Sequence, residues 1–357
     1  MKIAVDAMGG DYAPEVAVAG AVLAQPHCPA DLVLVGPEDR IHSILEKENP
    51  ASPLQVVHAQ DFIGMDEAGP VVIRKKKDAS ISVAMRLLAS GDVDAVVSAG
   101  NSAGIVAAAR HYVGLVRGLR RPALVVSLPT PEGQILLIDV GAHAEAVSDH
   151  LAQSAALAHA YLKTVAGLDS PRLGLLNIGK ERFKGTESTQ RAYALLERSR
   201  LNFVGNLEPQ ELFTGQADAV VCDGFVGNIV LKLHECWIGV WRQVFAKHLS
   251  PSGSAGSMQG SQQQYGRSFE NLFDHQEVGG APLLGARKTV VVAHGCSRES
   301  AIVNAIRVAV KTLEADSIAR VADYLDTTPI LSELKLYSAR WVLDHWKSRW
   351  GGHKKPS

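Results

Sequence analysis

Several short apolar runs of this 357-residue chain end in glycine beside a polar side chain, a pattern typical of anion-binding sites. Glycine lets backbone amides approach a ligand closely, and the start of a helix favours negative charge. One such turn alone is more often structural than ligand-binding, because glycine also simply permits turns. Their number predicts a phosphate site, whose candidate residues are Gly10, Gly100, Asn101, Ser102, Asn177, Asp223, Gly227 and His294.

Two further side chains have types suited to charge stabilisation. Lys184 stands beside Gly185, between a strand pattern and a helix pattern, and its ammonium could neutralise phosphate or a developing oxyanion. An exposed loop lysine is an equally good interpretation. Asn228 opens a helical pattern, where its amide could bind a carbonyl or phosphate or could cap the helix.

Cysteine and histidine chemistry is less strongly indicated. Cys222 ends an apolar run with no activating neighbour, and a buried, unactivated thiol is usually inert. His294 is a candidate acid/base or phosphate contact, and His143 deserves the same caution, since a histidine at a strand end is more often structural. No CxxC pair, no histidine pair at metal-ligand spacing and no dinucleotide or P-loop fingerprint is present. We therefore predict reduced cysteines, no metal and no cofactor.

The elements that must position these residues alternate along the chain. Continuous apolar strand patterns lead into helical patterns, which predicts a mainly parallel sheet covered by helices on both faces. Two runs, 122–127 and 134–139, lie closer together and predict a hairpin, so the sheet should be mixed. The fold expected is a doubly wound α/β domain with helices on both faces of the sheet. Ligands bind at the carboxyl ends of strands in such sheets, so the glycine turns should converge on one rim.

Composition limits the possible functions. The apolar fraction is 46%, the charged fraction is 20% and the net charge is −1, values of an ordinary globular protein without the basic excess of a nucleic-acid binder. No signal-peptide core and no membrane-spanning run of ~18 apolar residues is present, so we expect a cytoplasmic protein. The cationic run 74–77 could dock an acidic protein or be a solvated face.

All five tryptophans lie in two segments, 237–241 and 341–350. The helical pattern 229–249 has an apolar arc of about 200°, which requires two packing partners or a membrane surface. Ser, Gly and Gln then fill 12 of the 15 positions 250–264, and 331–357 is a basic, tryptophan-containing tail that is either a docked helix or a surface anchor. We expect a single domain over 1–330 with a helical and low-complexity insertion at 229–275, and dimer or membrane contacts at Trp237, Trp241, Val244 and Phe245.

Five segments occur in an order that resembles one family over most of residues 1–310. That family is the phosphate acyltransferase family of bacterial phospholipid synthesis, known as PlsX. Any one segment alone would be a weak signal, but five in order are specific. The segments are Val5–Asp11, Val97–Asn101, Gly174–Gly179, Val221–Val230 and Gly279–Gly285.

The resemblance implies reversible transfer of a fatty acyl group from acyl carrier protein to inorganic phosphate, which yields acyl phosphate. The resemblance also implies a Rossmann-like, three-layer α/β/α domain, a projecting helical insertion at the interface of a homodimer, and peripheral association with the membrane. It matches Lys184 and Asn228 to the family's proposed active-site lysine and asparagine. The residues suit this chemistry, because a thioester is already activated and needs mainly a held phosphate and a stabilised oxyanion. The alternatives are a phosphotransacetylase-like enzyme using acyl-CoA, a nicotinamide-dependent dehydrogenase, and a non-catalytic membrane scaffold that binds acyl carrier protein.

Overall fold

The computed structural model describes residues 1–67, 75–249 and 279–339, which form an eleven-stranded mixed sheet with helices on both faces. The strand order is β3-β2-β1-β4-β11-β10-β5-β6-β9-β7-β8. Strands of the first half are parallel to one another, and Val5 of the central strand pairs with Leu34 on one side and Val97 on the other. This half consists of β1 (Lys2–Asp6), β2 (Asp31–Gly36), β3 (Gln55–His58), β4 (Ala95–Ser98) and β11 (Thr289–Val292).

The second half begins with the predicted hairpin. The pairing of Val125 with Ile138 and of Thr130 with Gly133 makes its two strands antiparallel, which confirms the prediction of a mixed sheet. The later strands all run parallel to the second hairpin strand. This half consists of β5 (Ala123–Thr130), β6 (Gly133–Ile138), β7 (Leu173–Leu176), β8 (Phe203–Leu207) and β9 (Ala219–Val221).

One short strand, β10 (Ala281–Leu284), joins the two halves. Its first two residues pair with the end of β11, and its last two pair with the start of β5, both antiparallel. As a result β6, β9, β7 and β8 run opposite to the strands of the first half. The carboxyl ends of β4 and β11 lie at one end of β10, and the carboxyl end of β6 lies at its other end. The prediction that all strand ends meet at one edge of the sheet is therefore wrong. The strands of the two halves end at opposite edges, and these two rims approach each other across the short strand β10.

Apolar side chains divide the molecule into three layers, as predicted. One core cluster covers a whole face of the sheet, with α4, α5 and the start of α8 above it. The other face carries two clusters, one under α1, α2 and α10 and one under α6, α7 and α11. The helices are α1 (Glu15–Ala24), α2 (Glu38–Glu48), α4 (Ser80–Ser90), α5 (Ser102–Ala108), α6 (Ser148–Thr164), α7 (Glu187–Glu197), α8 (Gly224–Leu249), α10 (Glu299–Glu314) and α11 (Ser317–Thr327).

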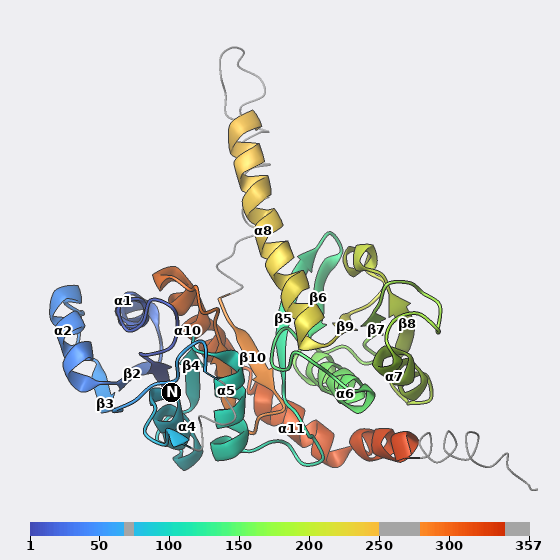
Figure 1. Ribbon diagram of the computed structural model, residues 1–357, viewed down its shortest axis with the longest axis horizontal. Helices are drawn as coiled ribbons and strands as arrows, with labels where there is room; N and C mark the ends of the chain where they lie inside the picture. Colours follow the sequence, from blue (N-terminus) through green and yellow to red (C-terminus); the bar gives the residue numbers. More distant parts are fainter. Residues whose placement is uncertain (68–74, 250–278, 340–357) are drawn as a thin grey trace, which may run out of the picture.

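Helix α8 starts between the two halves of the sheet and projects far beyond them (Figure 1). Leu231 is buried near its start, whereas Ile229, Leu233, Trp237, Val240 and Val244 are exposed on its shaft. The side chains of Trp241 and Phe245 and all of residues 250–278 lie outside the described residues. No helix in the described part of the chain is long and apolar enough to cross a membrane.

The first part of the basic tail is a docked helix. Residues 330–339 are helical, and Leu331 and Leu334 are buried in the core cluster beneath α6 and α11. The three tail tryptophans lie within 340–357, outside the described residues, so the anchor interpretation stays a prediction for that part.

Candidate active site

A cavity of about 190 Å³ lies where the two opposed rims meet. The first half contributes the turn after β4 and the end of β11, and the second half contributes Leu124, Val126 and Val140. One side is formed by the first turns of α8, through Asn228, Leu231 and Lys232. Four of the predicted ligand residues line this cavity together, namely Gly100, Ser102, Asn228 and His294.

Asn228 is held in place by the turn that follows β6. It lies in the second turn of α8, which begins at Gly224, so it does not cap the helix. Its Nδ2 donates to the Val140 carbonyl at 3.1 Å, and a Cβ at Gly141 would come within 2.8 Å of that nitrogen. An amide nitrogen has two N–H groups, so one remains for a ligand in the cavity. Asn228 is thus positioned to donate to a phosphate or carbonyl oxygen.

The turn after β4 is held by a buried carboxyl. Ser98 Oγ donates to Asp6 Oδ2 at 2.7 Å and accepts the Gly100 N–H at 3.1 Å. Burial raises the pKa of the Asp6 carboxyl above its ordinary value. A Cβ at Gly9 would lie 2.7 Å from the Gly100 nitrogen, so glycine at this position lets β1 and the turn pack closely. The glycine-rich segment after β1 therefore supports the cavity wall.

Two of the predicted ligand residues, Asn101 and Asp223, serve as helix caps. Asn101 Oδ1 accepts the Gly104 N–H at 3.1 Å at the start of α5, while its Nδ2 donates to the carbonyls of Met65 and Glu67. Asp223 Oδ1 accepts the Val226 N–H at 2.8 Å at the start of α8. These contacts place both side chains in the framework around the cavity.

Close packing accounts for Gly10 and Gly227. Gly10 has φ +114°, and a Cβ there would lie 3.2 Å from the Gly295 carbonyl oxygen. A Cβ at Gly227 would lie only 1.9 Å from the Asp139 carbonyl oxygen. Both glycines bring the cavity-lining segments close to neighbouring backbone.

Lys184 and Asn177 lie outside the cavity lining. They belong to the loop between β7 and α7, and β9 separates β7 from β6. Asn177 Nδ2 donates to the Lys184 carbonyl at 3.1 Å, and Gly185 follows with φ +85°. The Lys184 side chain is half-buried, with Nζ 5.7 Å from the ring centroid of Phe183.

Two charged residues of α8 escaped the sequence analysis. Lys232 lines the cavity one turn after Asn228, and Glu235 Oε1 lies 3.0 Å from His294 Nε2. Their spacing of four and seven residues from Asn228 places them on its side of the helix, which is the signal that would have identified them.

Cys222 is buried beside Asp139, and its Sγ donates to the Asp139 carbonyl at 3.5 Å. Burial, aided by the carboxylates of Asp139 and Asp223, raises the pKa of this thiol well above its ordinary value. The thiol is therefore protonated at neutral pH, and a protonated thiol is a poor nucleophile, in line with the expectation from the sequence. Among the described residues, no group of three or more His, Cys, Asp and Glu side chains could hold a metal ion.

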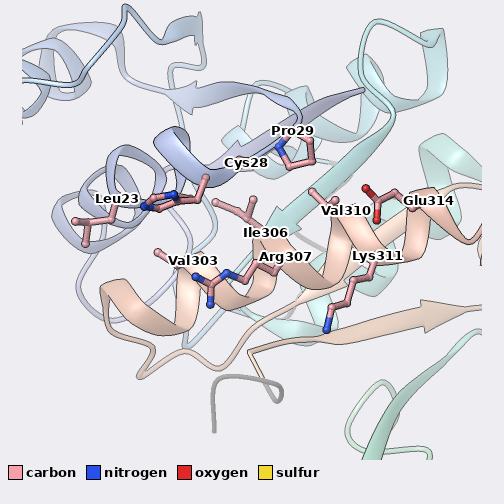
Figure 2. Close-up of a pocket in the computed structure, with 11 residues that line it drawn as sticks. Leu23, Cys28, Pro29, Val303, Ile306, Arg307, Val310, Lys311 and Glu314 are labelled. Atoms are coloured by element: carbon pink, nitrogen blue, oxygen red, sulfur yellow. The ribbon is translucent and has the colours of Figure 1, made fainter. Parts of the chain in front are cut away.

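Two other hollows lie away from this cavity. One, of about 270 Å³, lies between the C-terminal end of α1, with the turn that follows it, and one side of α10, and it holds none of the predicted site residues (Figure 2). The other, of about 520 Å³, is lined by Arg110, Arg120, Arg121 and His150 together with two leucines.

The cationic run before α4 is partly paired within the chain. The Lys76 ammonium lies 3.0 Å from a Glu67 carboxylate oxygen and 3.6 Å from an Asp61 oxygen. Lys75 and Lys77 are exposed, while Arg74 lies outside the described residues. Lys76 therefore already has intramolecular partners.

Comparisons with known proteins show the family of the chain. The family model described as "Fatty acid synthesis protein" matches residues 1–320. A phosphate acyltransferase of Syntrophobacter fumaroxidans is 52% identical over 357 residues, covering 98% of this chain and 99% of the relative. A phosphate acyltransferase of Aquifex aeolicus is 41% identical, covering 88% and 94%.

Solved structures support the fold. The EutD phosphotransacetylase of Staphylococcus aureus superposes with a TM-score of 0.54 at 16% identity, covering 90% of this chain and 94% of that one. A phosphotransacetylase of Streptococcus pyogenes gives a TM-score of 0.53 at 18% identity, covering 88% and 94%. At these identities the likeness concerns the fold alone.

Proposed function

Because the chain belongs to the phosphate acyltransferase family and is an enzyme that transfers acyl groups to phosphate, we propose that its donor is a fatty acyl group carried on acyl carrier protein. The product is acyl phosphate for phospholipid synthesis. The cavity at the junction of the two half-sheets, lined by Asn228 and the Gly100 turn, supports acyl transfer, and the basic hollow lined by Arg110, Arg120 and Arg121 carries the choice of an acidic protein as donor. The rival donor is acyl-CoA.

The reaction needs little beyond positioning and charge stabilisation. A phosphate oxygen attacks the thioester carbonyl, the carbonyl oxygen gains negative charge, and the carbon–sulfur bond then breaks. We expect the second N–H of Asn228 to stabilise phosphate or oxyanion, together with Lys232, which lines the same cavity. The family resemblance adds Lys184 from the neighbouring loop, as a further positive charge.

The Lys184 role is tested by Lys184→Ala with acyl-acyl carrier protein and phosphate as substrates. Loss of one charge-stabilising donor should lower kcat by about 10²–10³-fold. Lys180→Ala is the matched control, because Lys180 belongs to the same loop and its ammonium pairs with Glu211 at 2.6 Å. Near-normal turnover by folded Lys184→Ala would remove Lys184 from the mechanism.

An acidic carrier is favoured by the basic hollow beside the start of α6. Arg110, Arg120 and Arg121 line this hollow. Among the lining residues, as far as the structure describes the chain, only Arg120 pairs with a carboxylate, that of Asp149 at 3.6 Å. Arg121 donates to the backbone carbonyl of Glu145. Excess positive charge of this kind steers an acidic protein partner. Arg110→Glu should then raise the KM for acyl-acyl carrier protein and leave that for acyl-pantetheine unchanged. An equal effect on both donors would contradict docking there.

The exposed apolar residues of α8 support two remaining proposals, a homodimer and peripheral attachment of a cytoplasmic enzyme to the membrane. Leu233 and Trp237 lie on this face and are both more than half exposed. Sedimentation of Leu233→Glu should show dissociation if the face is a dimer contact. Vesicle flotation of the same variant and of a 340–357 deletion, which keeps the docked helix 330–339, tests membrane contact, and unchanged flotation of both would exclude it.

A further inference from the structure

His294 lines the cavity, and its imidazole pairs with a carboxylate. It follows β11 in the first half of the sheet, and Glu235 comes from α8, which rises from the second half. His294 Nε2 and Glu235 Oε1 are 3.0 Å apart, and the two side chains are 32% and 25% exposed. The carboxylate occupies Nε2, so Nδ1 is the ring atom left for a ligand.

The chemistry of the cavity still lacks a proton donor. When the carbon–sulfur bond breaks, the electron pair goes to sulfur, and an alkyl thiol has a pKa of about 8.5. Because this pKa lies above neutral pH, a proton delivered during departure lets the sulfur leave as the neutral thiol and so assists cleavage of the carbon–sulfur bond. Positioned acids typically accelerate such steps by about 10²–10⁴-fold.

We propose that the His294 imidazolium donates its Nδ1 proton to the departing thiolate, with Glu235 as the positioning residue that holds and stabilises the imidazolium. This rests on the proposed function. The phosphate oxygen–carbon bond forms, the carbon–sulfur bond breaks, and the proton moves from Nδ1 to sulfur. In reverse, the neutral ring removes the thiol proton while the thiolate attacks acyl phosphate.

Other charged groups surround His294. Lys232 lines the same cavity from α8, and Asp11 lies near Gly295 from the segment after β1. Arg298, just before α10, stacks on Tyr12 at 3.7 Å. Lys232 suits anion stabilisation, whereas the His294–Glu235 pair joins an ionisable ring to a carboxylate, the arrangement that orients a proton-transferring histidine.

The rival explanation is structural, because the pair also links α8 to the first half of the sheet. Leaving-group dependence separates the two. His294→Gln is assayed for acyl phosphate formation with an alkyl thioester and with the thiophenyl ester of the same acyl chain, whose thiolate leaves without a proton. We expect at least a 10²-fold loss of kcat with the alkyl thioester and less than a fivefold loss with the aryl thioester.

Glu235→Gln should lose about 10-fold in kcat with the alkyl thioester and little with the aryl thioester. This second variant keeps the test available if His294→Gln folds poorly. His42→Gln is the matched control, since His42 Nε2 faces Glu38 at 3.5 Å on the surface of α2, and it should leave both donors unaffected. Equal losses on both donors, or no loss on either, would overturn the proton-transfer role. Absence of acyl phosphate when the unsubstituted enzyme is given acyl-acyl carrier protein and phosphate would instead refute the proposed function.

Discussion

Gly227 offers a sharp test of how the cavity is built. A Cβ at this position would lie 1.9 Å from the Asp139 carbonyl oxygen and 2.9 Å from Cys222 Sγ, so in Gly227→Ala the first turn of α8 must retreat by about 1 Å. Helix propensity alone would favour alanine by about 1 kcal/mol. Overpacking against rigid backbone costs about 1–3 kcal/mol, which outweighs that gain. The variant should therefore be less stable despite its better helix former.

The consequence for activity is larger than that for stability. Asn228 is the next residue, and its bond to the Val140 carbonyl fixes it in the cavity wall. A misplacement of about 1 Å in a reacting group can cost about 10²-fold in rate. We expect kcat/KM for acyl phosphate formation to fall by about that factor, while thermal unfolding reports a lower Tm.

Gly239→Ala is the matched control, because it lies on the same helix and a Cβ there meets nothing within 4 Å. It should raise stability by up to about 1 kcal/mol and leave kcat/KM unchanged. If Gly227→Ala kept both the Tm and kcat/KM of the unsubstituted enzyme, the packing explanation would be wrong. Equal losses in the two variants would point to a general intolerance of α8 instead.

Three further predictions follow from the site and its surroundings. Alkylation of the native enzyme should label Cys236 and Cys296, which are exposed, and spare buried Cys222; labelling of Cys222 without unfolding would refute its inert state. Burial, followed by the charges of Arg121 and His143, lowers the pKa of His150 to about 4. Because the unfolded chain binds this proton more readily, the folded protein should lose stability as the pH falls from 6.5 towards 4. Thermal melts of His150→Gln over this range should show a smaller loss of stability than those of the unsubstituted protein. Asn101→Ala should cost about 1–2 kcal/mol of unfolding free energy through loss of the α5 cap, measured by denaturant titration, and an unchanged midpoint would contradict the capping role.

The sequence pattern predicts the three-layer fold and the hairpin because these depend on local periodicity. It does not predict the opposed halves of the sheet, which depend on pairings between residues distant in the chain. Ala281 pairs with Val292 on one side, and Leu283 pairs with Leu124 on the other. A four-residue strand such as β10 carries too little pattern to reveal both partners.

The candidate site divides in the same way. Residue type and strand-end position identify Asn228 and His294, which line the cavity. The same rule selects Asn101 and Asp223, because a side chain that accepts a helix N–H looks identical in sequence to one that binds a ligand. Glu235 is missed because the polar side of α8 is predicted to face solvent. Only the structure shows that His294 lies beside it.

The junction at β10 has a consequence for the order of folding. The cavity combines the turn at Gly100 and the end of β11 from one half with Val140 and Asn228 from the other, so neither half alone contains it. Contacts between such distant parts of a chain close late, because the intervening loops must be ordered first. Enzymatic activity should therefore return in the last phase of refolding, after the helical circular dichroism signal has recovered. The rate at which activity returns would then measure the rate at which the two halves dock.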